Sequence, residues 1–267
     1  MRLHVEVDGP RDGAPVVFLH GVSGSGLTYA WLPSEITDGH RVVRIDLRGH
    51  GRSEHAAGTY TVERYAEDVV EVLREQVGRP AVLVGHSLGG VVAWTLAQRH
   101  PELVVAAFLE DPPLYMGEPE EHERNGAIPV FRTLADAVER WRADGVSVDD
   151  AAAELAASPV GPDSHEDALA ARASALLAMD PGVLEGAIDR STLADTDTTA
   201  PVSVPVLVLA ADDAMSAFPS RHTERVAQTH PAVEVVRVDG APHAIHDSRA
   251  HRAAYVEHLA QFLAAHA

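Results

Sequence analysis

A serine flanked by glycines is the feature of this sequence that most clearly suggests chemistry. Ser87 is the centre of a G-H-S-L-G segment at positions 85–89, which follows the apolar run 80–84 and precedes the apolar run 90–97. The first run predicts a buried strand and the second a helix, so the serine is expected in a sharp turn between them. Glycine two residues away on either side permits the strained backbone that such a turn needs. We therefore predict that Ser87 is a nucleophile, with the amide of Leu88 at the helix start facing the group under attack.

A serine nucleophile requires a base that takes its proton, an acid that orients the base, and donors for the oxyanion. His243 is the predicted base because it follows an apolar run and a Gly-Ala-Pro turn, whereas most of the other fifteen histidines lie on predicted helices or exposed stretches. His246 lies in the same loop, but the spacing places no third ligand beside the two histidines, so no metal is predicted. The candidate acids are Asp111, Asp212 and Asp213.

Strands and helices must bring these distant residues together. Apolar runs predict strands at 16–19, 42–47, 81–84, 104–109, 204–210 and 233–238, and the alternating stretch 3–7 predicts the first strand of a hairpin. Helices are predicted over 61–76, 88–99 and 249–265. Each candidate site residue follows one of the predicted strands.

The stretch between residues 112 and 203 differs in character from the rest of the chain. It contains no continuous apolar strand run, and alanine-rich amphipathic pieces recur instead near 130–143, 148–157, 164–179 and 181–190. Strand character resumes at residue 204. The sequence therefore predicts a group of helices inserted between two strands of the core.

The chain resembles the α/β-hydrolase superfamily over nearly its whole length, and three motifs besides the serine turn carry the resemblance. V-V-F-L-H-G-V at 16–22 is similar to the family's oxyanion strand and loop, R-I-D-L-R-G-H-G-R-S at 44–53 to its D-x-R-G-x-G-x-S turn, and V-D-G-A-P-H at 238–243 to the segment that carries its histidine. The order of serine, acid and histidine is also the family's. The resemblance implies an α/β fold, with a mostly parallel central sheet flanked by helices and a helical cap inserted after the sixth strand.

The resemblance also implies a division into domains. The hydrolase core would comprise residues 1–111 and 204–267, and the helical cap residues 112–203. In the family, such a cap supplies most of the substrate pocket. We therefore expect a small-molecule substrate to bind between the two parts.

Two further features of the sequence gain a role from the resemblance. The glycine-rich loop 21–26 lacks the Lys-Ser/Thr pair of a P-loop and the G-x-G-x-x-G order, so no nucleotide is predicted there. Instead, the resemblance implies that the loop brings the amide of Val22 to the oxyanion, beside that of Leu88. His50 lies in a turn that is structural in the family, so a structural role is expected for it.

The acid is the one place where the sequence departs from the commonest family pattern. The family usually places it at the third residue after a glycine that ends the seventh strand. In this chain Ala211 replaces that glycine, and the third residue is Ala214, which cannot serve as an acid. Asp212 and Asp213 lie close to the slot but out of register.

A variant of the family places the acid elsewhere. Some haloalkane dehalogenases and zearalenone-type lactone hydrolases carry it at the end of the sixth strand, two dozen residues after the nucleophile. Asp111 follows Ser87 by 24 residues and fits that pattern, although it could also be an ordinary turn aspartate before proline. Strand alternation predicts that Glu110 faces the other way.

The resemblance implies a serine hydrolase that cleaves a small-molecule ester or lactone through an acyl-enzyme, without a cofactor. Haloalkane dehalogenation and epoxide opening are not expected, because those branches attack with aspartate. Two alternatives stay open. A carbon–carbon bond hydrolase of diketone type uses the same residues, and the same scaffold serves non-hydrolytic lyases, isomerases and ligand-binding proteins.

Composition limits the other classes of function. The 267 residues contain no cysteine, which excludes disulfides and thiolate chemistry. The formal charge of −19 argues against nucleic acid and anionic lipid as partners, because both call for clustered cations. No apolar run approaches the roughly 20 residues that span a bilayer, and residues 1–13 are too polar for a signal peptide, so a cytoplasmic protein is expected. The sequence does not specify an oligomeric state.

Overall fold

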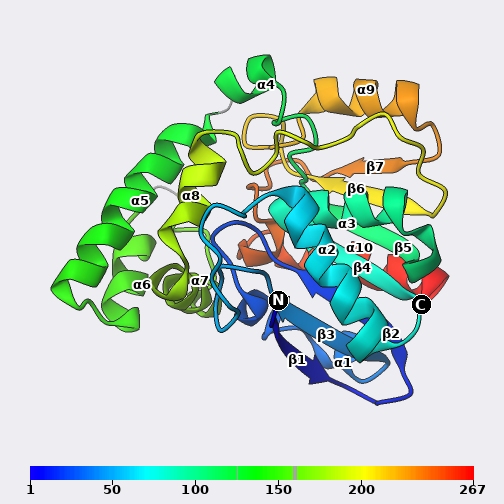
Figure 1. The fold of residues 1–267 in the computed structure, drawn as a ribbon, viewed down its shortest axis with the longest axis horizontal. Helices are drawn as coiled ribbons and strands as arrows, with labels where there is room; N and C mark the ends of the chain where they lie inside the picture. Colours follow the sequence, from blue (N-terminus) through cyan, green and yellow to red (C-terminus); the bar gives the residue numbers. More distant parts are fainter. Residues whose placement is uncertain (125, 159–160) are drawn as a thin grey trace.

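A mostly parallel sheet forms the centre of the computed structural model, which describes residues 1–124, 126–158 and 161–267 (Figure 1). Its seven strands among these described residues are, in sheet order, β1 (His4–Asp8), β3 (His40–Asp46), β2 (Ala14–Leu19), β4 (Ala81–His86), β5 (Val104–Glu110), β6 (Val206–Ala210) and β7 (Glu234–Arg237). Strand β1 is antiparallel to β3, and the pairs from β3 to β7 are parallel. The carboxyl ends of β4 to β7 therefore meet at one edge of the sheet.

The first strand does not form the expected hairpin. Both edges of β2 are occupied by parallel neighbours, β3 and β4, so β1 pairs with β3 instead, with His4 opposite Asp46. The connection crosses the start of β3 at Gly9, whose positive φ of 77° and close approach to the carbonyl oxygen of His40 require glycine. The prediction of a hairpin was wrong because a turn signal does not specify which strand is the neighbour.

Helices cover both faces of the sheet, as the strand pattern predicts. The first face carries α2 (Val62–Val72), its π-helical extension η2 (Leu73–Val77), α3 (Leu88–Arg99), η3 (Pro101–Leu103) and α9 (Ser220–Thr229). The second carries η1 (Gly26–Tyr29), α1 (Ser34–Thr37), η4 (Ile245–Asp247) and α10 (Arg252–His266). Alternation along β2 sends Val17 into the first hydrophobic cluster and Phe18 into the second. Because β4 is buried along its whole length, the serine turn starts from a rigid strand.

The segment between β5 and β6 is helical, as its composition predicts. It contains α4 (Pro119–Glu123), α5 (Ala127–Asp144), α6 (Val148–Ala156), α7 (Glu166–Ala178) and α8 (Pro181–Ile188). In Figure 1, α5 to α8 form a group beside the sheet, and α4 lies near α9. Positions 125, 159 and 160 of the expected cap lie outside the described residues. The insertion follows the fifth strand along this chain, not the sixth, because the described residues before it form five strands.

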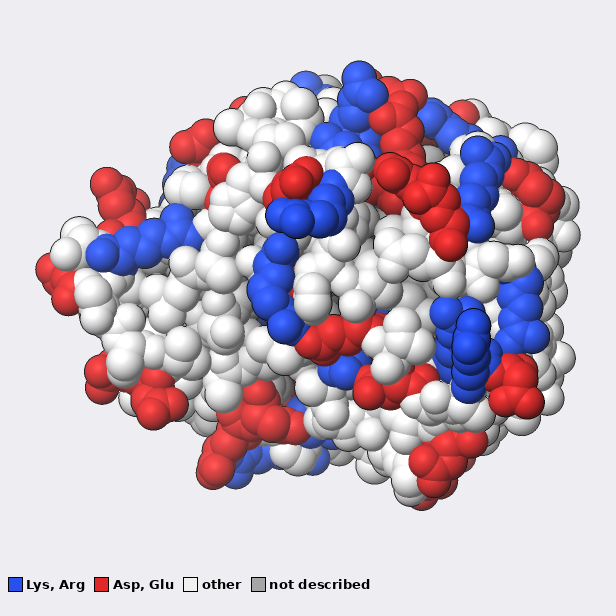
Figure 2. All heavy atoms as spheres, turned by 60° about the horizontal axis from the view of Figure 1, so that its bottom comes forward, with Lys and Arg blue, Asp and Glu red and all other residues white. Residues whose placement is uncertain are grey.

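The surface and the helices give two further observations. Among the described residues, no helix is both long enough and apolar enough to cross a membrane. Figure 2 shows acidic and basic side chains interspersed on the face it presents, without a continuous basic area there.

Candidate active site

Ser87 occupies a strained turn between β4 and α3. Its backbone has φ 51° and ψ −117°, a conformation that non-glycine residues seldom adopt. A Cβ atom at Gly85 would lie 2.3 Å from the carbonyl oxygen of Gly89, and one at Gly89 would lie 2.1 Å from that of Leu19. Both glycines are therefore required by close backbone packing, which is the physical reason for the G-x-S-x-G pattern.

The ladder of the sheet continues past the strand ends into this turn. His86 pairs with Glu110, and the amide of Ser87 then donates to the carbonyl oxygen of Glu110 at 2.9 Å. The amide of Asp111 donates in turn to the carbonyl oxygen of Leu209 at 2.9 Å. Hydrogen bonds of two adjacent ladders, β4–β5 and β5–β6, therefore hold Ser87 and Asp111 at a set separation.

Asp111 lies against His243. Its Oδ2 atom accepts a hydrogen bond from His243 Nδ1 at 2.6 Å and another from the amide of Ala217 at 2.8 Å. Its Oδ1 atom accepts from the amide of Ala211 at 3.0 Å and the hydroxyl of Ser216 at 2.5 Å. Burial alone would raise the pKa of Asp111, but the hydrogen bond and charge of His243, with further hydrogen bonds, outweigh burial and lower it. The fully buried carboxylate is thus stabilised in its charged form.

The two alternative acids lie in the loop after β6 and serve other contacts. Asp212 accepts hydrogen bonds from the amides of Gly240 at 2.9 Å and Ala214 at 3.0 Å. The exposed Asp213 accepts from the amide of Ser220 at 2.5 Å. Neither carboxylate is bonded to His243 within the part of the chain that the structure describes.

His243 is the accessible member of the group. Its side chain is 37% exposed, whereas Ser87 is 9% exposed and Asp111 fully buried. The carbonyl oxygen of His243 accepts from Nε2 of His86 at 3.2 Å. The structure gives no hydrogen bond between the Ser87 hydroxyl and the His243 ring, two described residues, and contacts of this kind often form only when substrate binds.

The loop that contains Val22 passes beside the serine. A Cβ atom at Gly21 would lie 3.2 Å from Cβ of Ser87, so the backbone of this loop passes close to the serine. His20 donates from Nδ1 to the carbonyl oxygen of Gly21 at 2.8 Å, and Nε2 of His50 lies 2.9 Å from that of Val22. Two buried histidines thus hold this loop. The expectation that His50 is structural agrees with these contacts, whereas the role of His20 was not predicted.

Sequence reasoning also missed a second group of buried residues beside the first. Glu110 and His246 are both fully buried, and Oε2 of Glu110 lies 2.6 Å from Nδ1 of His246. His86 completes a group whose nitrogen and oxygen atoms lie within 4.8 Å of one another, a spacing that a metal ion could use. However, the hydrogen bond already engages the facing atoms of Glu110 and His246. A signal existed in the sequence: Glu110 precedes Asp111, and His246 follows His243 by three residues.

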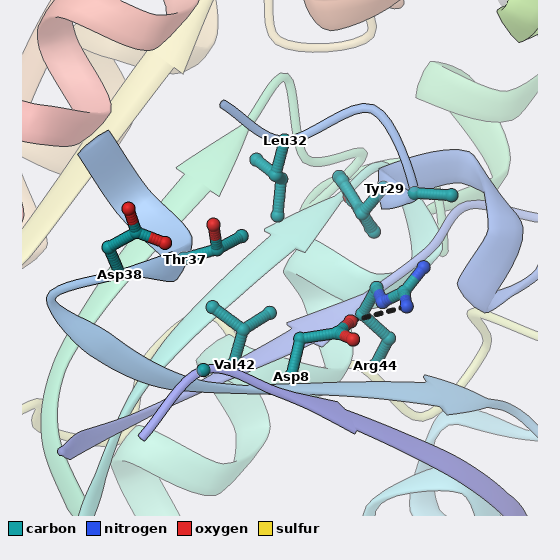
Figure 3. Close-up of a pocket in the computed structure, with 9 residues that line it drawn as sticks. Asp8, Tyr29, Leu32, Thr37, Asp38, Val42 and Arg44 are labelled. Atoms are coloured by element: carbon teal, nitrogen blue, oxygen red, sulfur yellow. Dashed lines mark hydrogen bonds and ion pairs between the residues drawn. The ribbon is translucent and has the colours of Figure 1, made fainter. Parts of the chain in front are cut away.

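Figure 3 shows a hollow of about 310 Å³ elsewhere on the molecule. It is lined by Asp8, Gly9, Tyr29, Ala30, Leu32, Thr37, Asp38, Val42 and Arg44. Asp8 and Arg44 form an ion pair with each other at 2.5 Å, and none of the predicted site residues lines the hollow. The hollow is therefore separate from the predicted site.

Comparison with known proteins identifies the family of this chain. The pattern of the alpha/beta hydrolase family matches residues 16–257, which is most of the chain. The chain belongs to the alpha/beta hydrolase family. The resemblance noted from the motifs and the predicted α/β fold, with a mostly parallel sheet flanked by helices, are thereby confirmed.

Relatives of this alpha/beta hydrolase differ in their named activities. Epoxide hydrolase B of Mycobacterium tuberculosis is 41% identical over 108 residues, which cover 38% of this chain and 30% of that protein. Lipase LipV of the same organism is 38% identical over 110 residues, 41% of each chain. The chain thus spans less than half the length of either relative.

Solved structures match over the full length. E-2-(acetamidomethylene)succinate hydrolase has a TM-score of 0.77 at 23% identity, covering 98% of this chain and 94% of that one. A thermophilic esterase from Thermogutta terrifontis has a TM-score of 0.70 at 27% identity, covering 98% and 92%. The enol-lactonase from Burkholderia xenovorans LB400 has a TM-score of 0.71 at 24% identity, covering 98% and 96%. The matches below 25% identity show the fold alone.

Proposed function

We propose that this hydrolase cleaves a small-molecule ester or lactone through an acyl-enzyme, with Ser87 as nucleophile, His243 as base and Asp111 as acid. The observation that carries the proposal is the 2.6 Å hydrogen bond from Nδ1 of His243 to buried Asp111, beside a serine on a strained turn. Asp111 is assigned as the acid because it bonds to His243, whereas the contacts of Asp212 and Asp213 are with loop amides. Esters are favoured because the thermophilic esterase at 27% identity matches nearly the whole chain, and lactones are included because a lactone is a cyclic ester.

The first half-reaction forms the acyl-enzyme. Because Nδ1 of His243 donates to Asp111, the lone pair of the ring is on Nε2, where it takes the proton of the Ser87 hydroxyl. The serine oxygen then bonds to the substrate carbonyl carbon. The amides of Val22 and Leu88 stabilise the oxyanion, Leu88 from the first residue of α3. The imidazolium returns its proton to the leaving oxygen as the carbon–oxygen bond breaks.

The second half-reaction releases the acid. Nε2 of His243 takes a proton from water, whose oxygen attacks the acyl carbon, and the same amides stabilise the new oxyanion. The serine oxygen leaves and recovers the proton from the imidazolium. No step requires a metal or an organic cofactor.

We also propose that residues 112–203 form a substrate-selecting cap on a core of residues 1–111 and 204–267. Support comes from α7, which lies against the loop that carries His243. The amide of His165 donates to the carbonyl oxygen of Asp247 at 2.9 Å, and Arg172 Nη2 donates to its carboxylate at 3.0 Å. A substrate approaching His243 would therefore meet this helix.

Active-site labelling tests the proposal. A fluorophosphonate should label the wild-type protein at Ser87, and Ser87→Ala should lose labelling and reduce turnover of an activated ester by about a millionfold. Ser220→Ala, at an exposed serine, should keep both. A panel of acyl esters and lactones would then rank substrates. Labelling that survives Ser87→Ala would disprove the role of Ser87, and tight ligand binding without labelling would indicate a binding protein.

A further inference from the structure

The buried side chain of Glu110 has no part in the mechanism above, yet it contacts the catalytic loop twice. Its Oε1 atom accepts a hydrogen bond from the amide of His246 at 3.0 Å, and its Oε2 atom accepts from Nδ1 of the same residue at 2.6 Å. Both side chains are at most 1% exposed. One carboxylate therefore binds the backbone and the ring of a single residue, three positions after His243.

Glu110 and Asp111 hold the same loop from adjacent positions in the chain. Glu110 ends β5, and Asp111 turns away from it with a positive φ of 43°. The change of direction sends one carboxylate to His246 and the other to His243. His86 supplies a third contact from β4, since its Nε2 donates to the carbonyl oxygen of His243. Three side chains from two neighbouring strands thus determine where the catalytic loop lies.

Charged and aromatic groups surround His246 on every side. Asp247 lies 3.3 Å from its Nε2 atom, and Arg172 on α7 pairs with the other oxygen of Asp247 at 3.0 Å. The rings of His86, Tyr29 and Tyr255 pack around the imidazole with centroids 4.8, 5.4 and 5.7 Å away.

These surroundings favour a charged imidazole at His246. Burial alone would lower the pKa of His246, but Glu110 and Asp247 outweigh burial and raise it. The Glu110–His246 contact is thus a buried ion pair, in which removal of one partner leaves the other uncompensated.

We propose that Glu110 and His246 form a second carboxylate–imidazole pair that positions the catalytic histidine. The pair fixes the loop at residue 246, so that the ring of His243 keeps Nδ1 on Asp111 and Nε2 toward Ser87. Glu110 and His246 are positioning residues, because neither meets the substrate. The inference rests on the proposed function, since it assigns a task within the same reaction.

A conservative substitution tests the pair without emptying the core. In Glu110→Gln, the side chain keeps its shape and can still accept from the amide of His246, but the charge is lost. We expect kcat on an activated ester to fall about 10- to 100-fold, which is the loss typical of outer-shell groups that orient a metal-bound histidine. KM should stay within about twofold. The far-downfield proton resonance of the His243–Asp111 hydrogen bond should shift or broaden.

The chain offers a matched control for this variant. Glu121 is also buried and also bonded to a buried histidine, His222 Nε2 at 3.0 Å, but it ties α4 to α9 instead of holding the catalytic loop. Glu121→Gln should therefore leave kcat and the proton resonance unchanged. A fall in kcat that is equal in both variants would show a general effect of stability and overturn the proposal.

A double variant tests whether the two residues act as a unit. His246→Asn places an amide nitrogen near the position of Nδ1, and Glu110→Gln with His246→Asn replaces the ion pair by two neutral amides. If the residues act together, the double variant should lose no more kcat than the worse single variant. Independent, multiplying losses would overturn the proposal.

Two further outcomes separate this inference from its foundation. Failure of the phosphonate to label the wild-type protein would disprove the proposed function itself. Labelling of wild type together with wild-type kcat in Glu110→Gln would disprove only the positioning role. Loss of wild-type kcat on chelation, restored by zinc alone, would show that His86, Glu110 and His246 hold a metal and would overturn the proposal.

Discussion

The carboxyl edge of the sheet and the helical segment between β5 and β6 are built in different ways. At the edge, Ser87 and Asp111 are held by backbone ladders, and the side chains around them are buried and hydrogen-bonded. In the helical segment, α5 buries only Val138 and Trp141 of its eighteen residues. The segment shares a hydrophobic cluster with one face of the core, and ion pairs add to that contact: both side chains of Glu118–Arg225 are partly exposed, whereas Arg172 pairs with the buried Asp247.

Under the proposed function, this difference separates the chemical step from the selection of substrate. Backbone ladders hold atoms at set distances, which the proposed nucleophile and acid require. Partly exposed ion pairs contribute little to stability, so their residues can change at low cost. We therefore expect substitutions at the edge to act on turnover, and substitutions in the helical segment to act on stability or on the choice of substrate.

After the loss of Ser87 itself, the largest effect is expected from Asp111→Asn. Asparagine can adopt the positive φ at this position, so the protein should stay folded. Its side-chain amide, however, favours the wrong tautomer of His243. Turnover should fall about ten-thousandfold. Asp212→Asn and Asp213→Asn, measured with the same ester, should each stay within about tenfold of wild type. Near-normal turnover in folded Asp111→Asn, with collapse in either loop variant, would reverse the assignment of the acid.

An intermediate effect, on stability, is expected at Glu121, which joins α4 to α9 through Arg221 and His222. This effect should depend on pH. Hydrogen bonds from Arg221 lower the pKa of Glu121 from 4.5 to about 2 against the effect of burial, with help from His222. A lowered pKa stabilises the fold above pH 4.5, and that stabilisation is lost as the pH falls toward 2. Urea unfolding should show about 2 kcal/mol lost over this range in wild type, and a flatter profile in Glu121→Gln. Parallel profiles would show that this tie adds no stability.

The smallest effect is expected from Arg172→Gln in α7. The ion pair with Asp247 spans 3.0 Å, but the arginine side chain is 24% exposed, so solvent weakens the attraction. The free energy of unfolding should fall by less than about 1 kcal/mol, with turnover of a small activated ester changed only slightly. A loss as large as that of Glu110→Gln in turnover would show that the helical segment shares the rigidity of the edge.

The same contrast explains what could be predicted from the sequence. The serine turn was predictable because any larger residue at its glycines would collide with nearby backbone, as a Cβ atom at Gly89 would with Leu19. Strands β2, β4 and β6 were predictable because both of their faces are buried. Asp111, the hydrogen-bond partner of His243, was also ranked first, because its spacing from Ser87 fits a variant of the family and Ala214 occupies the usual position of the acid.

Contacts between distant segments were beyond such reasoning. Strand alternation correctly predicted that Glu110 and Asp111 face different ways. Alternation alone did not identify His246, 136 positions along the chain, as the partner of Glu110. The neighbour of β1 was mispredicted for the same reason, because it depends on the order of strands in the whole sheet. The ties of Glu121 to α9 join segments whose spacing carries no periodic signal.

The hydrogen-bond ladders that join β4 to β5 and β5 to β6 limit how Ser87 and Asp111 can move. The amides of Ser87 and Asp111 donate to neighbouring strands, so they belong to the same cooperative unit as the core of the sheet. They can separate only when that unit opens. His243 reaches them on a loop outside the strand ladders, and the contacts cited for His243 itself come from the side chains of Asp111 and His86. Of the three residues, the histidine is therefore the one whose local fluctuations can switch the site between a ready and an idle arrangement while the fold stays closed.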